Sequence, residues 1–336
     1  MKRAVLLVAL ALVGAGCGGD ADPTTTAAAP ATTAAPTTAA PTTTAAPASS
    51  TTTAAPETAP ARTFTGGDGV EVEIGDVSRI VSLNGDVTEI LFELGLGANV
   101  AAIDVTTTYP AAALDLPVVG FGQMLAPEGV LAFGPTLVIG DQQVGPPETI
   151  QQLRDAGIPV VILETQTTLD GVSTKIAQIA EIVDEVDAGI ALADRVQDEI
   201  AAAQALVPAD AEARKVAYLY ARGPQTIFLF GAGMPTQAMI EGAGAIDGGA
   251  TTGVFGPAPL TPEALIAAAP DVLVLPEAGF GALGGPEALL AIPGVAETPA
   301  GAAGDFLVYD EAYFFNLGPR TGQALEEFIK DLYGIS

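Results

Sequence analysis

The chain contains an internal repeat. Residues 125–139 align with residues 260–274 without a gap, and residues 79–83 align with residues 214–218 at the same offset. Each longer copy has a proline beside an acidic residue, then an apolar stretch, a second proline and a β-branched run. This is the pattern of a helix that leads into a buried strand. Repetition at a fixed offset is typical of a chain built from copies of one structural unit. The repeat therefore predicts two related α/β units.

Candidate strands and helices alternate along both units. The first unit has strand patterns near 79–83, 98–104, 136–140 and 158–163, and the second has them near 214–220, 226–230, 271–276 and 305–309. The principal helical patterns lie near 127–133, 147–156, 235–243, 262–269 and 320–333. Alternation of this kind indicates mostly parallel sheets that helices cover on both faces. We therefore predict an α/β fold with two Rossmann-like lobes.

A long proline-free stretch joins the two units. Residues 171–206 carry apolar side chains at helical spacing, and Gly189 suggests a break between two helices. A helix of about 20 residues spans about 30 Å, roughly the width of one lobe. We therefore predict an N-terminal lobe at 64–165, a connecting spine helix at 166–207 and a C-terminal lobe at 208–336. A coiled coil with a partner helix is the alternative, which the lack of sustained heptads disfavours.

The first residues have the pattern of an export signal. Two basic residues precede an apolar run at 4–13, and small residues lead to Cys17. The segment 14–17 resembles the bacterial lipobox, so residues 1–17 are predicted to be a lipoprotein signal peptide, with Cys17 as the lipidated residue. Residues 18–63 consist mainly of Ala, Thr and Pro, a composition that favours an extended, disordered tether. These features predict an extracytoplasmic protein, which is anchored by its lipid to the outer face of the cell membrane.

The composition excludes several classes of function. With 40 acidic and 12 basic residues the net charge is −28, which argues against a nucleic-acid partner. The sequence has no histidine and one cysteine, so it has no Ser-His-Asp triad, no Cys-His pair and no zinc site of the usual kinds. A hydrolase would need a Ser-Lys or carboxylate mechanism, but Lys175 and Lys215 lie where a helix and a strand are expected rather than in loops.

Two tyrosines are candidates for a ligand site. In open α/β sheets, ligands bind beyond the carboxyl ends of the strands. Tyr220 ends the strand predicted at 214–220, and Tyr109 lies in the loop after 98–104. Arg222 lies two residues after Tyr220, so on a strand both point to one face. A phenolate is a ligand type found on haem iron, and a neighbouring arginine favours the anion. Spacing alone leaves a second reading open, a buried tyrosine next to a surface arginine.

Several motifs resemble a known family. They lie at 79–90, 107–110, 137–139, 144–147 and 317–322. With the lipobox and the connecting helix, they make the chain similar to the helical-backbone (class III) periplasmic binding proteins of ABC importers, and within these to the haemin-binding, HmuT-type group. The resemblance covers most of 78–335, and the tyrosine segments 107–110 and 220–222 point most narrowly to haem.

The resemblance implies haem as a transported ligand, with no catalytic cofactor and no enzymatic activity. It implies iron ligation by Tyr220 and Tyr109, with Arg222 behind Tyr220. Some relatives pair the tyrosine with a histidine in the segment that corresponds to 120–125, where this chain has Gln123 and Met124. The departure leaves coordination open: Tyr220 binds the iron alone, Tyr109 and Tyr220 both bind it, or the cargo is not haem. Met124 is a weaker ligand candidate, because a flexible methionine more often packs in a core.

The resemblance also implies a partner. In this class, one surface glutamate on each lobe contacts an arginine of a dimeric ABC permease, and Glu128 and Glu263 lie at equivalent places in the repeat. Acidic residues at a helix start also have a simpler explanation, favourable interaction with the helix dipole. Arg320 is expected to brace the C-terminal lobe or, less favoured, to pair with a ligand carboxylate. The alternative cargo is a ferric siderophore or a corrinoid.

Four aromatic residues in glycine-rich loops are candidates for an apolar cleft lining, although each is also a plausible core residue. They are Phe121, Phe255, Phe280 and Tyr313.

Overall fold

The computed structural model describes residues 61–336. The predicted signal peptide, Cys17 and all but the end of the predicted tether lie outside these residues. The described chain begins with an antiparallel hairpin of β1 (Arg62–Thr65) and β2 (Glu71–Ile74), which the sequence patterns did not predict. Within 61–336 no helix is both long enough and apolar enough to cross a bilayer.

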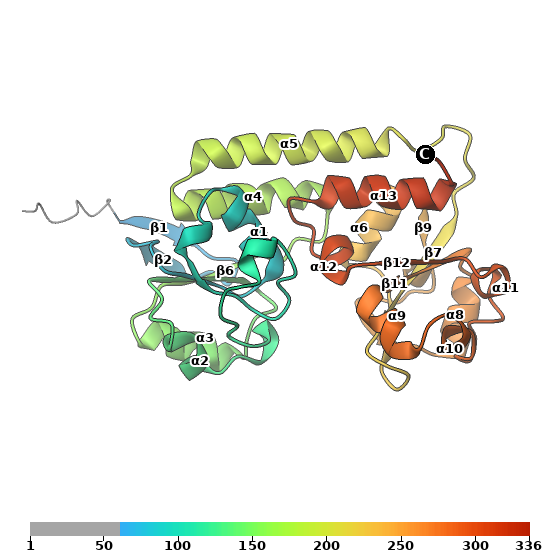
Figure 1. Cartoon of the computed structure of the whole chain (residues 1–336), viewed down its shortest axis with the longest axis horizontal. Coiled ribbons are helices and arrows are strands. Elements are labelled where there is room, and N and C mark those ends of the chain that lie inside the picture. The colour runs from blue at the N-terminus through green and yellow to red at the C-terminus, as the bar shows by residue number, and fades with distance from the viewer. Residues whose placement is uncertain (1–60) are drawn as a thin grey trace, which may run out of the picture. The chain divides into compact units, whose positions relative to one another are not determined.

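The first lobe is a parallel four-stranded sheet in the order β4-β3-β5-β6. Its strands are β3 (Ile80–Ser82), β4 (Val100–Ala102), β5 (Leu137–Asp141) and β6 (Val160–Leu163). Alternate side chains belong to different apolar clusters, because successive residues of a strand point to opposite faces. Helices α1 (Gly85–Glu93) and α4 (Leu169–Val183) cover one face, and α2 (Pro127–Leu131) and α3 (Pro147–Asp155) cover the other (Figure 1).

The second lobe has a six-stranded sheet in which β9, β7, β11 and β12 are parallel. The strands are β7 (Lys215–Ala221), β8 (Ile227–Phe230), β9 (Ile246–Asp247), β10 (Pro257–Pro259), β11 (Val272–Pro276) and β12 (Phe306–Tyr309). Strand β8 pairs antiparallel with β7, and β10 pairs antiparallel with β8. The loop 222–226 between β7 and β8 is too short for a crossover connection, which explains this departure from a parallel sheet.

Eight helices accompany this second sheet in the described chain. They are α6 (Pro235–Gly242), α7 (Gly248–Thr251), α8 (Pro262–Ala268), α9 (Glu277–Leu283), α10 (Pro286–Leu290), α11 (Pro299–Ala303), α12 (Glu311–Phe315) and α13 (Thr321–Tyr333). The predicted repeat is visible in three pairs of elements. The starts of β3, α2 and β5 precede those of β7, α8 and β11 by one constant offset.

Two helices form the predicted spine, which confirms the fold class. Helix α5 (Val186–Gln204) packs against α4, the other helix of the spine, and against α13 of the second lobe (Figure 1). The break between α4 and α5 lies at Asp184, which has a left-handed φ of 66°, so the break predicted at Gly189 was wrong. Gly189 instead lies inside α5, where a Cβ atom would come within 2.2 Å of the Ala180 side chain.

We expect Gly189→Ala to destabilise the protein by about 1–3 kcal/mol, the cost of overpacking a close contact. The added methyl group would meet the Ala180 Cβ, which is fixed directly to the α4 backbone, so the α4–α5 pair must separate to admit it. Urea unfolding of both proteins measures the difference. Gly281→Ala is the control, since an added Cβ there meets no atom within 4 Å. Equal stability of Gly189→Ala and the unsubstituted protein would contradict the packing argument.

Candidate ligand-binding site

Tyr220 lies at the carboxyl end of β7, as predicted, with its ring between two neighbours. It is half-buried, stacks on Phe230 at a centroid distance of 5.3 Å, and has the Arg222 guanidinium 4.6 Å from its centroid. The pKa of Tyr220 is raised, first because burial disfavours the phenolate and then because of the negative charge of Glu311, while Arg222 partly offsets both. The free site therefore holds a neutral phenol.

Glu311, the first residue of α12, is a site residue that sequence reasoning missed. Its Oε2 lies 2.8 Å from Nη2 of Arg222, and its Oε1 accepts a hydrogen bond of 3.0 Å from the same nitrogen. The helix is fixed at its start by Asp310, which accepts a 2.9 Å hydrogen bond from the backbone N–H of Tyr313. Both acids follow directly after β12, so the carboxyl-end rule applied to the strand predicted at 305–309 would have found them.

The Tyr109 loop reaches the same helix start. The hydroxyl of Thr108 donates a 3.3 Å hydrogen bond to Asp310 Oδ1, while Arg222 beside Tyr220 pairs with Glu311. Tyr109 is 39% exposed, and the guanidinium carbon of Arg320 lies 4.0 Å from its ring centroid. The two predicted tyrosine segments, from different lobes, therefore converge on two adjacent acidic residues.

Arg320 connects the lobes, rather than bracing only its own. Its Nε and Nη2 each donate hydrogen bonds of 3.0 Å to the carboxylate of Glu89 in α1, and its guanidinium also lies 5.0 Å from the ring centroid of Tyr313. Burial raises the pKa of Glu89, and the Arg320 interactions oppose that rise. Arg320, directly before α13, therefore links the second lobe to both Glu89 and Tyr109 of the first lobe.

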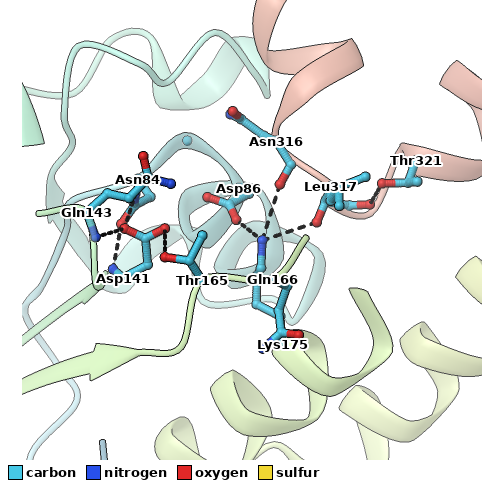
Figure 2. Close-up of polar contacts among 12 residues, drawn as sticks. Asn84, Asp86, Asp141, Gln143, Thr165, Gln166, Lys175, Asn316, Leu317 and Thr321 are labelled. Carbon is cyan, nitrogen blue, oxygen red and sulfur yellow. Dashed lines mark hydrogen bonds and ion pairs between the residues drawn. The ribbon is translucent and has the colours of Figure 1, made fainter. Parts of the chain in front are cut away.

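A buried lysine lies beside this contact. Lys175 of α4 forms an ion pair with Asp86 of α1 and donates 3.2 Å hydrogen bonds to the backbone carbonyls of Asn316 and Leu317 (Figure 2). An ammonium group has three N–H donors, so this arrangement uses all of them. Leu317 has a positive φ of 47°, uncommon for a residue other than glycine. The spine, the first lobe and the second lobe meet at this one cation.

The polar groups at the carboxyl end of β5 form hydrogen bonds with neighbouring residues of the same lobe. Asp141 exchanges hydrogen bonds with Asn84, accepts one from Thr165, and has its pKa raised mainly by burial (Figure 2). These contacts tie β5 to the segments that follow β3 and β6. The cluster is therefore a support for the sheet edge.

Asp104 forms hydrogen bonds with the loop that carries Tyr109. It is almost fully buried and accepts hydrogen bonds from the hydroxyls of Thr106, at 2.8 and 2.9 Å, and Thr107, at 3.3 Å. Burial is the main cause that raises its pKa from 3.8 to about 6. The ionised form is therefore less favourable in the folded protein than in the unfolded chain.

The stability of the protein relative to Asp104→Asn is expected to fall as the pH rises from 4 to 7. In this window the folded state retains a proton on Asp104 that the unfolded chain has released, so the stabilising contribution is complete below pH 4 and is lost through pH 6. The full change is on the order of 3 kcal/mol. Denaturant unfolding of both proteins at pH 4, 5, 6 and 7 measures it, and a difference independent of pH would contradict the assignment.

The other predicted residues lie elsewhere. Gln123 and Met124 form a short 3-10 turn, where Gln123 donates a 3.4 Å hydrogen bond to Gln143 and Met124 is 79% exposed. Within 61–336 neither hydrogen-bonds to Tyr109 or Tyr220. Of the aromatic candidates, Phe121 and Phe255 are exposed, and Phe280 and Tyr313 are half-buried. In the described residues no group of three or more acidic or cysteine side chains is placed to hold a metal ion.

Glu128 and Glu263 occupy equivalent, exposed positions. Each is the second residue of its helix, α2 or α8, directly after a proline. The structure therefore preserves the equivalence that the repeat predicted for these two side chains.

A family model and several solved structures match this chain, and all of them are of periplasmic or haem-binding proteins. The family model described as periplasmic binding protein matches residues 80–313. Among solved structures, the periplasmic haem-binding protein RhuT from Roseiflexus sp. RS-1 in apo form is 42% identical, with a TM-score of 0.75 over 77% of this chain and 99% of that one. The haem-binding protein HmuT is 34% identical, with a TM-score of 0.77 over 82% and 91%. HmuT has also been solved with alanine in place of a tyrosine, of an arginine two residues later, and of a histidine.

Curated relatives carry a different ligand in their names. The vitamin B12-binding protein of Vibrio campbellii is 33% identical over 115 residues, which are 34% of this chain and 42% of the relative. The cobalamin-binding protein of Halobacterium salinarum is 30% identical over 204 residues, 58% and 53% of the two chains. The chain thus spans about half the length of these relatives.

Proposed function

Because this chain belongs to the periplasmic binding protein family, we propose that it captures haem outside the cytoplasm and delivers it to an ABC importer for iron acquisition. The observation that carries the proposal is Tyr220 at the carboxyl end of β7, stacked on Phe230 and covered by Arg222. Tyr220 and Arg222 have the spacing of the tyrosine and arginine replaced in HmuT. The family and the solved neighbours are binding proteins, which supports capture without covalent chemistry.

In this proposal, Tyr220 loses its phenolic proton and binds ferric haem iron through oxygen, a ligand type known for haem. The iron charge offsets the cost that burial and Glu311 impose on the phenolate. Tyr109 is the candidate second ligand, because its loop contacts the start of α12 as Arg222 does. Because the sequence has no histidine, we propose phenol oxygen as the coordinating atom. Met124 and Gln123 are less suitable, since their described contacts lie within the first lobe.

The test is a titration of the full chain with haemin, followed in the visible spectrum. We expect saturation at a defined stoichiometry with a phenolate-to-iron charge-transfer band. A featureless titration, or a spectrum unchanged from free haemin, would refute haem capture.

A corrinoid is the second candidate, and the names of the curated relatives are the observation that favours it. Titration with cyanocobalamin under the same conditions separates the two ligands. Saturable binding of cyanocobalamin together with no binding of haemin would transfer the assignment to corrinoids.

We further propose that Glu128 and Glu263 dock on a dimeric permease, one glutamate per lobe. Their exposure and their equivalent places on α2 and α8 support this role. Each single change to lysine is expected to lower haem uptake by reconstituted transporter several-fold, because a favourable charge contact becomes repulsive. Haemin affinity is expected to stay unchanged, and Glu287→Lys, an acid at the same position of α10, is the control. Undiminished uptake by both variants would exclude the docking role.

The anchor and the domain limits complete the proposal. We place a lipid on Cys17, with the Ala-, Thr- and Pro-rich residues before β1 as the tether to the outer face of the cell membrane. The lobes are proposed at 64–165 and 208–336 with the spine at 166–207, and β1 moves the start of the first lobe to Arg62. Mass spectrometry of the membrane-extracted protein tests the lipid on Cys17, and its absence would refute the anchor.

A further inference from the structure

Nearly all the basic side chains in residues 61–336 are already paired. Of ten, eight form ion pairs with carboxylates: Arg62, Arg154, Lys175, Arg195, Arg214, Arg222, Arg320 and Lys330. Arg79 donates to backbone carbonyls of Phe133 and Gly134. Lys215 begins β7, at the opposite end of the strand from Tyr220. The two arginines near the tyrosines are therefore both neutralised by acidic partners.

The pairing at Arg222 is close but contributes little to stability. Glu311 approaches Nη2 to 2.8 Å, while the Arg222 and Glu311 side chains remain 45% and 29% exposed. An ion pair with this exposure is worth about 0–1 kcal/mol. Its main consequence is therefore local, because it neutralises the Arg222 guanidinium that lies over the Tyr220 ring.

A carboxylate of an incoming ligand would meet unfavourable surroundings here. To reach Arg222 it must displace or approach Glu311, and Asp310 lies next to Glu311 in the chain. On the Tyr109 side, Arg320 is held at 3.0 Å by the carboxylate of Glu89. Like charges placed together disfavour a wrong partner, a common basis of specificity.

We propose that Glu311 is a specificity-determining residue that occupies Arg222 and so denies this guanidinium to carboxylates of the cargo. The inference rests on the proposed haem function and states how the cargo is held. Ferric porphyrin binds through its iron and its apolar ring, and its two propionates stay in water. Ferric chelates with several negative charges are rejected, which separates haem from the anionic siderophores.

The test compares haemin with its dimethyl ester, in which both propionates are uncharged. The unsubstituted protein is expected to bind the two within about threefold of each other. Glu311→Gln frees Arg222 and is expected to prefer haemin by about tenfold or more, the range of one charge-assisted contact. Both probes carry the same iron, so any effect of the substitution on Tyr220 ligation cancels in the ratio.

Glu326→Gln is the matched control, since Glu326 forms a similar ion pair with Lys330 on α13. Its ratio is expected to equal that of the unsubstituted protein. In Glu311→Gln, the preference for haemin should also decline as salt is raised from 50 to 500 mM, because ions screen exposed charge pairs.

Two results would overturn the inference: a loss of tenfold or more on esterification in the unsubstituted protein, or a ratio in Glu311→Gln equal to that of the control. Either leaves haem binding itself intact. Failure of the unsubstituted protein to bind either probe would instead refute the proposed function, so the two failures are distinguishable.

Discussion

Tyr220→Phe is expected to weaken haemin binding by at least about 100-fold, since loss of a direct ligand should exceed the 10–100-fold typical of outer-shell partners. The charge-transfer band should disappear with it. The substitution removes only the oxygen, and the ring retains its stacking on Phe230, so the fold is expected to be unchanged. Visible titration gives the affinity and the band, and far-ultraviolet circular dichroism checks the fold.

Tyr218→Phe is the matched control. Tyr218 lies two residues earlier on the same strand, is fully buried, and its hydroxyl has no hydrogen-bond partner among the described residues. Removal of that hydroxyl should leave haemin binding intact. Tyr109→Phe then separates the ligand sets, because the band survives if Tyr220 alone binds iron and shifts if both tyrosines do. An unaltered band in Tyr220→Phe would exclude the assignment of this ligand.

The sequence was sufficient for eight strands of the two lobe sheets and for one end of the site, but not for the β1–β2 hairpin, β9 or β10. Strands and the helices between them follow from apolar periodicity, and Tyr220 and Arg222 follow from their place at the end of a strand. The antiparallel β7–β8 pair was accessible too, because 222–226 leaves no room for a crossover helix. A five-residue helix such as α12 gives no periodic signal, so the sequence indicates Glu311 only through its place just after the strand predicted at 305–309.

The ion-pair partners of the charged residues could not be predicted from the sequence, for a different reason. Arg320 pairs with Glu89 from 231 positions away, and Arg222 with Glu311 from 89. No periodicity connects such positions, since the packing of the two lobes brings Arg320 to Glu89 and the fold of the second lobe brings Arg222 to Glu311. Gly189 illustrates a related error: glycine permits a helix break, but it also permits the close contact with Ala180 that occurs here.

Lys175→Met is expected to destabilise the protein by about 3–5 kcal/mol, because it leaves Asp86 buried without its compensating charge. It also removes the donor shared by the backbone carbonyls of Asn316 and Leu317, so this segment of the second lobe loses its contact with α4. Urea unfolding measures the loss. Lys215→Met is the control, as Lys215 forms no ion pair in the described part of the chain.

The double variant Lys175→Met/Asp86→Leu tests the same argument from the other side. Replacing a buried ion pair by apolar groups of similar volume is often neutral, so the double variant should recover much of the stability that Lys175→Met loses. The carbonyls of Asn316 and Leu317 still lack a donor, so recovery should be incomplete by about 1–3 kcal/mol. A cost of less than about 1 kcal/mol for Lys175→Met would place this pair with ordinary surface ion pairs. Lys175 would then not be a buried cation that stabilises the junction of the spine with both lobes.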